Sequence, residues 1–315
     1  MSDAKHCKVL IIGSGPAGYT AAIYAARASI EPTIVTGLQA GGQLTITTDV
    51  ENYPGFADPV MGPELMEAMR QQAENVGANI IYDLITDVDL ESTPKRAVAD
   101  SGAVFTADTI IISTGAQARW LGLDSEQKFN GYGVSACATC DGFFYRGKDV
   151  VVIGGGNTAV EEALYLSNIC SKVTLIHRRD ELRSEKILQN RLFKTENIEV
   201  KWNSVLGEVL GDEEPLGVTG VRIKDVNTGD SEELSVHGVF IAIGHTPSTE
   251  LFVGKLPMDD EGYLIKHADS TATDIPGVYA AGDVTDKVFR QAVTAAGMGC
   301  MAALEAEKYI AELDD

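Results

Sequence analysis

Two cysteines near the middle of the chain have a spacing that supports redox chemistry. Cys137-Ala-Thr-Cys140 places them three positions apart. Such a pair could cycle between dithiol and disulfide, or it could form half of a zinc site. Structural zinc needs four ligands, and neither the remaining cysteines nor the histidines have a matching spacing. The pair therefore predicts thiol–disulfide chemistry and no metal site.

An acidic residue, Asp141, directly follows the second cysteine. Cleavage of a disulfide releases a thiolate that must be protonated, and a carboxyl group with a raised pKa could supply the proton. Asp141-Gly142 is also an ordinary turn signal. From the spacing alone, both interpretations of Asp141 remain open.

A glycine motif of the form G-x-G-x-x-G/A occurs twice. Its two copies consist of Gly13, Ser14, Gly15, Pro16, Ala17 and Gly18, and of Gly154, Gly155, Gly156, Asn157, Thr158 and Ala159. In this motif the first glycine permits a tight turn, the second lets a phosphate approach the backbone, and the last small residue lets helix pack on strand. The pyrophosphate lies at the N-terminus of the following helix. Two copies predict two bound dinucleotides.

The segments around each motif indicate the same order of strand, turn, helix and strand. The sequence predicts helices over 19–28 and 160–167, second strands over 33–36 and 173–176, and further strands over 109–116 and 238–245. Another strand ends at Gly282-Asp283, and a helix follows over 290–313. The predicted fold class is α/β, with two Rossmann-like dinucleotide-binding domains of the three-layer FAD/NAD(P)-binding type, the second inserted into the first. Residues 1–117 and 249–315 would form the outer domain, and 118–248 the inserted one.

The residues after the second strand of each unit bear on which dinucleotide is bound. In the inserted domain they include His177, Arg178, Arg179 and Arg183. Arginines at this position pair with the 2′-phosphate of NADPH, although a solvated basic turn is the alternative. In the outer domain the same position is Thr36, which fits the rules for neither NAD nor NADP.

Composition excludes several classes of partner. The chain has 25 basic and 46 acidic residues and a net charge of −21, so it would repel nucleic acid and anionic membrane surfaces. The longest apolar run, 239–243, is far shorter than the ~18 residues of a membrane span. An odd number of scattered cysteines does not fit a secreted disulfide framework. We therefore expect a soluble, cytoplasmic protein.

These motifs together resemble the low-molecular-weight thioredoxin reductases. The resemblance runs from about Lys8 to Leu313 and rests on residues 13–18, 41–44, 51–52, 137–144, 154–159, 177–179, 282–283 and 290–292. The larger disulfide reductases, similar to glutathione reductase, carry their redox cysteines soon after the first glycine motif. Here no cysteine lies between Cys7 and Cys137, which favours the small class.

The resemblance implies cofactors and site residues. FAD would contact the first glycine motif together with Thr36, Gly37, Gly42, Gln43, Asn52, Gly282, Asp283, Arg290, Gln291 and Ala292. NADPH would contact Gly154, Gly156, Asn157, Thr158, His177, Arg178, Arg179 and Arg183. Cys140 would face the flavin, Cys137 would attack the partner, and Asp141 would act as the acid.

The implied activity is that of an NADPH-dependent thioredoxin-disulfide reductase. Thioredoxin would be the protein substrate, and the chain would form a homodimer. The alternatives are a flavoprotein that reduces another thioredoxin-like or peroxiredoxin-linked protein, and a non-catalytic flavin redox sensor. Because one flavin face cannot hold the nicotinamide and the disulfide at once, the inserted domain is expected to rotate, with hinges near 117–120 and 244–248.

Overall fold

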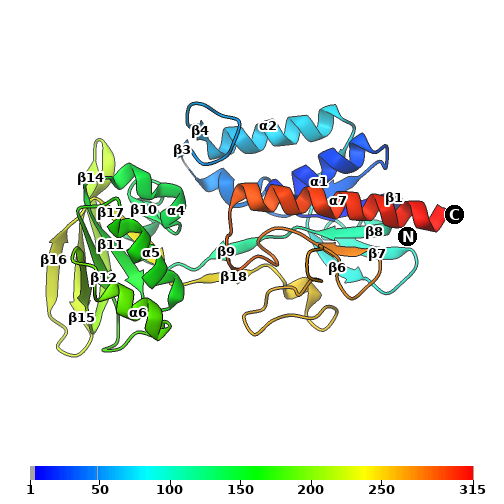
Figure 1. Cartoon of the computed structure of the whole chain (residues 1–315). Helices are drawn as coiled ribbons and strands as arrows, with labels where there is room; N and C mark the ends of the chain where they lie inside the picture. Colours follow the sequence, from blue (N-terminus) through cyan, green and yellow to red (C-terminus); the bar gives the residue numbers. More distant parts are fainter. Residues whose placement is uncertain (1–3, 48, 315) are drawn as a thin grey trace. The chain divides into compact units, whose positions relative to one another are not determined.

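The computed structural model describes residues 4–47 and 49–314 and divides into two compact units. Unit 1 comprises Met1–Gln117 and Thr246–Asp315, and unit 2 comprises Ala118–His245. In Figure 1, unit 2 is drawn mostly in green and yellow. The chain passes between the units at two short strands, β9 (Ala116–Ala118) and β18 (His245–Pro247), which pair with each other.

Unit 1 contains a seven-stranded sheet whose central part is parallel. The parallel strands are, in spatial order, β5 (Asn79–Ile81), β2 (Thr33–Val35), β1 (Lys5–Ile12), β8 (Val104–Ile112) and β19 (Val278–Ala280). The end of β8 pairs with β19, with Ile110 opposite Val278, whereas its beginning pairs with antiparallel β7 (Lys95–Ala99), which in turn pairs with β6 (Ile85–Asp89). The carboxyl ends of β1, β8 and β19 therefore meet at one edge.

The two faces of this sheet are buried by different elements. Side chains alternate along β1, so that Val9 and Ile11 lie in one core and Leu10 and Ile12 in the other. The first core lies beneath α1 (Pro16–Arg27), α2 (Gly62–Asn75) and α7 (Ala292–Asp314). The second includes Phe252 of the 3-10 helix η3 (Glu250–Phe252). Burial on both faces explains the continuous apolar run of β1.

A short excursion follows β2 in unit 1. It contains the 3-10 helix η1 (Gly42–Ile46) and the antiparallel pair β3 (Asp49–Val50) and β4 (Val60–Met61). Gly62, which begins α2, allows a close approach, because a Cβ there would lie 2.1 Å from the carbonyl oxygen of Leu44. The absence of a Cβ at this position therefore allows η1 to pack against the start of α2.

Unit 2 is built around a parallel sheet of five strands. Their spatial order is β10 (Val134–Ser135), β17 (Gly238–Ala242), β11 (Asp149–Gly154), β12 (Lys172–Ile176) and β13 (Ile198–Lys201). One face is covered by α5 (Asn157–Ser167) and α6 (Lys186–Leu192). The other is covered by an antiparallel sheet of β14 (Ser204–Glu213), β15 (Leu216–Asp225) and β16 (Ser231–Ser235). The remaining elements are α3 (Asp124–Lys128), α4 (Ala138–Asp141) and the 3-10 helix η2 (Gly142–Tyr145).

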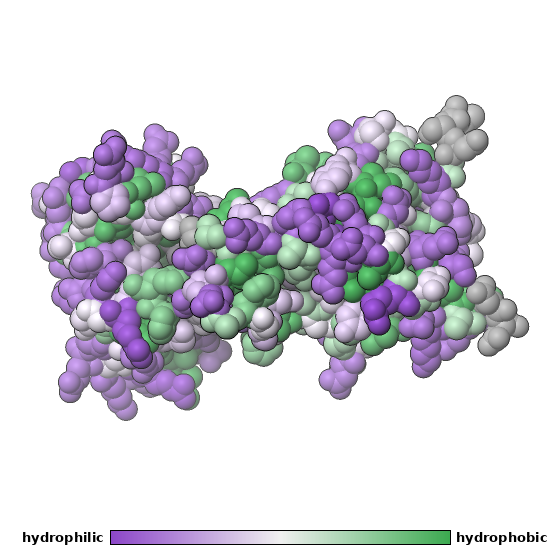
Figure 2. Space-filling view, turned by 90° about the horizontal axis from the view of Figure 1, so that it is seen from above, coloured by the Kyte–Doolittle hydropathy of each residue, from purple (hydrophilic) through white to green (hydrophobic). Residues whose placement is uncertain are grey.

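The expected fold class is confirmed, because each unit is a three-layer α/β structure and the second is inserted into the first. The sequence did not predict the antiparallel strands β6 and β7, which extend the sheet of unit 1, or β14 to β16, which form a further layer in unit 2. On the face shown in Figure 2, hydrophilic residues cover much of each unit. Within residues 4–47 and 49–314, no helix has the length and apolar character required to cross a membrane.

Candidate active site

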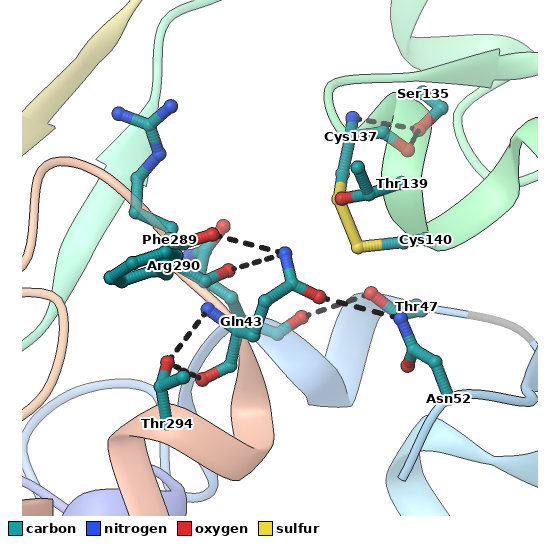
Figure 3. Close-up of a disulfide and its surroundings, with 11 residues drawn as sticks. Gln43, Thr47, Asn52, Ser135, Cys137, Thr139, Cys140, Phe289, Arg290 and Thr294 are labelled. Atoms are coloured by element: carbon teal, nitrogen blue, oxygen red, sulfur yellow. Dashed lines mark hydrogen bonds between the residues drawn. A yellow bond between two sulfur atoms is a disulfide. The ribbon is translucent and has the colours of Figure 1, made fainter. Parts of the chain in front are cut away.

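The two cysteines of the C-x-x-C segment form a disulfide in unit 2 (Figure 3). Cys137 is the N-cap residue of α4, and the Cα atoms of Cys137 and Cys140 are 5.3 Å apart. The N–H groups of Cys140 and Asp141 donate to the carbonyl oxygen of Cys137, at 3.3 and 3.1 Å. Both cysteines are partly exposed. The disulfide is therefore partly accessible to solvent.

Small residues seat this turn on the helical layer of unit 2. Ala138 is 1% exposed and belongs to the same core as the buried residues of α5. A Cβ at Gly142 would lie 2.9 Å from the Leu166 side chain, so a larger residue there would require the side chains around it to shift. The position of the disulfide thus depends on packing within unit 2.

The buried Ser135, which the sequence reasoning missed, holds the first cysteine. Its Oγ accepts a hydrogen bond from the Cys137 N–H at 3.0 Å, and its hydroxyl lies 3.4 Å from the Cys137 carbonyl oxygen, to which it donates (Figure 3). A serine whose side chain accepts from the N–H two residues later is a known local turn pattern. That signal was present in Ser135-Ala-Cys137.

Asp141 occupies an apolar environment beside the disulfide turn. Desolvation raises the pKa of its carboxyl group, and a hydrogen bond with Ser135 opposes that shift. Its Oδ1 is buried and has no hydrogen-bond partner among the described residues. Burial, together with the charge of Asp141, raises the pKa of Tyr145 to about 12. Burial therefore makes the carboxyl group of Asp141 easier to protonate than an exposed aspartate, and the protonated form is the one that donates a proton.

The first glycine motif lies at the carboxyl end of β1, where α1 begins. Gly13 has a φ of +104°, and a Cβ there would lie 2.3 Å from the carbonyl oxygen of Ser113. Gly15 is the N-cap residue of α1, which has no side-chain cap, and Pro16, Ala17 and Gly18 form the first helical turn. A Cβ at Gly15 would meet no atom within 4 Å. Gly13 is required by the fold, whereas Gly15 leaves open space at a helix N-terminus.

The loop after β2 lies beside this motif. The hydroxyl of Ser14 donates to the Thr36 carbonyl oxygen at 2.9 Å and accepts from the N–H of Gly41 at 3.0 Å. A Cβ at Gly42 would lie 3.3 Å from Gly15 Cα. Ser14 thus fixes the loop that carries Gly37 and Gly42. The N–H of Gly37 itself donates to the backbone carbonyl oxygen of Asp83 at 2.9 Å.

Amide side chains gather before α7, also in unit 1. Asn52 Nδ2 donates to Gln291 Oε1 at 3.3 Å, and Gln291 Nε2 donates to the Phe289 and Arg290 carbonyl oxygens, each at 3.1 Å (Figure 3). Gln43 Nε2 donates to Gln117 Oε1 at 2.5 Å. The structure therefore places Asn52 in hydrogen-bond contact with the segment from Arg290 to Ala292, which is the first residue of α7.

Two aspartates organise the segment between β19 and α7. A Cβ at Gly282 would lie 2.9 Å from the side chain of Ala17, so Gly282-Asp283 lies against the start of α1. Desolvation, with a smaller contribution from Asp286, raises the pKa of Asp283 to about 7. Asp286 was not singled out from the sequence; its carboxylate accepts from the N–H groups of Val288, Phe289 and Arg290 at 2.9, 2.9 and 3.3 Å.

The second motif repeats this geometry in unit 2. Gly154 has a φ of +159°, and a Cβ there would lie 2.4 Å from the Ala242 carbonyl oxygen. Gly156 is the N-cap residue of α5, again without a side-chain cap, and Asn157 and Thr158 begin the helix. A Cβ at Gly156 would meet no atom within 4 Å.

The basic residues lie next to this motif, after β12. Arg178, Arg179 and Arg183 are exposed. His177, in contrast, is buried beneath the glycine turn: a Cβ at Gly155 would lie 2.2 Å from its ring, and its Nε2 lies 2.9 Å from the Glu181 carbonyl oxygen. Burial lowers the pKa of His177. It supports the turn from below, while the arginines present their charges to solvent.

Both units have the same two features expected of a dinucleotide-binding site. Each has a helix N-terminus that no side chain caps and, at its N-cap glycine, a space that a Cβ would occupy. Such a terminus binds phosphate through free N–H groups and the helix dipole. Within the described ranges, no three histidine, cysteine or acidic side chains gather as metal ligands would.

The other cysteines lie outside this chemistry. Cys7 and Cys170 are buried free thiols, and Cys300 is partly buried. Burial raises the pKa of Cys7 to about 12 and that of Cys170 to about 11. Thiols with such pKa values hold their protons at neutral pH and are poor nucleophiles.

Comparison with known proteins identifies the class that this fold and site define. Residues 7–299 match the family described as pyridine nucleotide-disulphide oxidoreductase. The chain therefore belongs to that family, and the expected enzyme class, a disulfide oxidoreductase, is confirmed.

Its relatives within the family carry a narrower name. The thioredoxin reductases of Rickettsia conorii and Vibrio cholerae are 59% and 58% identical to the chain, over 96% and 98% of its length and 98% of theirs. The solved thioredoxin reductase from Giardia duodenalis superposes with a TM-score of 0.93 at 41% identity, over 98% of this chain and 99% of that one. The resemblance expected from the motifs is confirmed.

Proposed function

We propose that the chain reduces the disulfide of thioredoxin with electrons taken from NADPH through FAD. The observation that carries the proposal is the Cys137–Cys140 disulfide, held in a turn with the desolvated Asp141, in a unit that also contains a dinucleotide motif. A family of disulfide oxidoreductases and relatives named thioredoxin reductase support it.

Each unit would hold one cofactor. FAD would bind in unit 1 along the first glycine motif, the loop from Thr36 to Gln43, Asn52, Gly282-Asp283 and the segment from Arg290 to Ala292. NADPH would bind in unit 2 at Gly154, Gly156, Asn157 and Thr158, with its 2′-phosphate facing the exposed arginines. The chemistry that the cofactors supply when bound is hydride donation and onward transfer of the electron pair.

The chain's own groups would carry out the thiol chemistry. Two electrons break the Cys137–Cys140 bond, and two protons complete the dithiol. Asp141, whose carboxyl pKa is raised by desolvation, would deliver one of them from its protonated form and would recover it from water. The Cys137 thiolate would then attack one sulfur of the thioredoxin disulfide and release the other, and the Cys140 thiolate would attack the Cys137 sulfur of the mixed disulfide and displace the thioredoxin sulfur. The disulfide is thereby restored, and thioredoxin leaves with two thiols.

Two further statements belong to the proposal. A dithiol that is regenerated in each cycle suits a reducing compartment, so we place the protein in the cytoplasm. We also infer a homodimer, on the basis of the family. Size-exclusion chromatography with light scattering tests the second statement directly.

The deciding experiment is an anaerobic titration followed by turnover. NADPH should bleach the bound flavin, and subsequent addition of oxidised thioredoxin should restore the flavin colour while two thiols form for each NADPH consumed. Bleaching without thiol formation would instead indicate a redox sensor. Thiol formation only with another thioredoxin-like protein would support the alternative substrate.

A further inference from the structure

The loop between β12 and α6 carries Arg183 and is hydrogen-bonded from two directions through its backbone. The N–H of Arg183 donates to the Gly155 carbonyl oxygen at 2.8 Å, which ties the loop to the glycine turn. The N–H of Glu185 donates to Asn157 Oδ1 at 2.9 Å, which ties it to the first residue of α5. The guanidinium of Arg183 is exposed, so the position of its charge depends on how firmly this backbone is held.

A third tie comes from the buried side chain of Gln189 on α6, which is 8% exposed. Its Nε2 donates to the Ser184 carbonyl oxygen at 2.7 Å and to the Leu182 carbonyl oxygen at 3.3 Å. An amide nitrogen has two N–H groups, and both are used. Since Leu182 and Ser184 are the neighbours of Arg183 in the chain, a single side chain holds the backbone on each side of that arginine.

We propose that Gln189 is a positioning residue for nucleotide specificity, acting through Arg183. The inference rests on the proposed binding of NADPH in unit 2 and deepens it. A charged side chain on a loosened loop loses more conformational freedom when it pairs with a phosphate. Because Gln189 already holds the loop, Arg183 loses less conformational freedom on binding, and only a nucleotide with a 2′-phosphate gains from this. NADH and NADPH share all other contacts, so Gln189 should increase the preference for NADPH over NADH.

Gln189→Leu tests the proposal, because leucine fills similar space and donates no hydrogen bond. Loss of two buried hydrogen bonds should raise the KM for NADPH and the dissociation constant of 2′,5′-ADP about tenfold. The KM for NADH and the affinity for 5′-AMP should stay unchanged, as should kcat. The 2′,5′-ADP titration measures binding without turnover. Equal losses for both nucleotides would overturn the proposal, because a merely structural role affects both alike.

Ser184→Ala is the matched control in the same loop. Ser184 is also buried, but its Oγ makes no hydrogen bond with the described residues. Its removal should therefore leave the KM for NADPH unchanged. Gln189→Glu provides a second variant of the same shape as the wild type. One oxygen of its carboxylate would keep the contact with Lys186 Nζ, which lies 3.4 Å from Gln189 Oε1, whereas the other would face the two carbonyl oxygens without a proton to donate, so its NADPH affinity should also fall. An NADPH affinity in Gln189→Glu equal to that of wild type would contradict the proposal.

A double-mutant cycle shows whether Gln189 acts through Arg183. In an Arg183→Ala background, Gln189→Leu should have no further effect on 2′,5′-ADP binding. Additive losses would refute action through Arg183. Titration of the wild-type protein distinguishes a failure of the proposed NADPH site from a failure of the role of Gln189. If it binds 2′,5′-ADP no better than 5′-AMP, the proposed NADPH site fails; if it discriminates and Gln189→Leu discriminates equally, only the role of Gln189 fails.

Discussion

Gly15 and Gly156 occupy equivalent positions in the two units. Each is the N-cap residue of its helix, with φ and ψ of −66° and −173° in one case and −91° and −174° in the other. A Cβ at either residue would meet no atom within 4 Å, whereas a Cβ at Gly13 would lie 2.3 Å from Ser113. Glycines of one motif thus differ: the fold requires Gly13, whereas Gly15 and Gly156 leave open space, which the proposed function assigns to a ligand.

Alanine substitutions should separate these reasons. Gly15→Ala should fold normally but lose most of its flavin, as measured by the ratio of absorbance at the flavin band to that of the protein. Gly156→Ala should keep the flavin and show a raised KM for NADPH. Gly13→Ala is the structural control; it should lose at least about 2 kcal/mol of unfolding free energy through strain and steric conflict. Full flavin content in Gly15→Ala would contradict this assignment.

Serine variants of the two cysteines should differ in spectrum. Cys137→Ser and Cys140→Ser should both abolish thioredoxin reduction while retaining flavin and NADPH oxidation by artificial acceptors, because only the disulfide step is lost. The long-wavelength charge-transfer band should be present in Cys137→Ser, where the Cys140 thiolate survives beside oxidised flavin. The same band in Cys140→Ser instead would reverse the assignment of the two roles.

Asp141 should give turnover a pH dependence of defined sign. Because burial raises the pKa of its carboxyl group, the proton-donating form predominates at low pH and is lost as the pH rises through that pKa. Thioredoxin reduction should therefore decline on the alkaline side of this pKa. Asp141→Asn should lack this decline and be slower by about 100-fold or more, while reduction of artificial acceptors by NADPH remains normal. An unchanged pH profile in Asp141→Asn would exclude Asp141 as the acid.

The arginines after β12 should determine the preference for NADPH. Replacing Arg178 and Arg179 by alanine removes charge-assisted contacts of about 1.5 to 3 kcal/mol each, so the KM for NADPH should rise by one to three orders of magnitude. Activity with NADH should hardly change. Steady-state kinetics with both nucleotides measures the difference, and a parallel loss would mean that the exposed arginines serve another purpose.

The strands β9 and β18 should act as the hinge of a domain rotation. The chain passes between the units at these strands, and Gly244, directly before β18, has a φ of +100°. Cross-linking unit 2 to unit 1 with a bifunctional amine reagent should block thioredoxin turnover while sparing reduction of the internal disulfide by a flavin that is already reduced. Full thioredoxin turnover in the cross-linked protein would refute the rotation.

The sequence predicted those parts of the fold that depend on local pattern. Gly13 and Gly154 do have positive φ angles, and the helices after them begin where the motif requires. The antiparallel strands went unnoticed for a physical reason. Pairing of β14 with β15 shifts register twice, after Leu206 and after Leu210, and each shift breaks the two-residue alternation on which strand prediction depends.

The sequence predicts a candidate site residue when a motif indicates its role. It does not when that role depends on a contact with residues far away in the chain. Cys137 and Cys140 could be recognised from their spacing. Gln189 and Asp286 could not, because the importance of each comes from the backbone groups to which it is hydrogen-bonded in the folded chain. For His177 the sequence and the structure differ. Its place in the sequence indicates a basic cluster, whereas the structure buries it beneath Gly155, where its side chain supports the turn.

The inserted unit begins and ends at adjacent points. Close to its two ends, the N–H of Arg119 donates to the Gly244 carbonyl oxygen at 3.0 Å. A segment whose ends lie side by side can be removed or exchanged with little loop-closure cost to the rest of the chain. In the gene, codons 118–245 therefore form one continuous segment that encodes a whole unit. Its insertion creates only two junctions, and these lie next to each other in space. Under the proposed function, exchange of this segment would change the electron donor of the outer unit without redesign of either core.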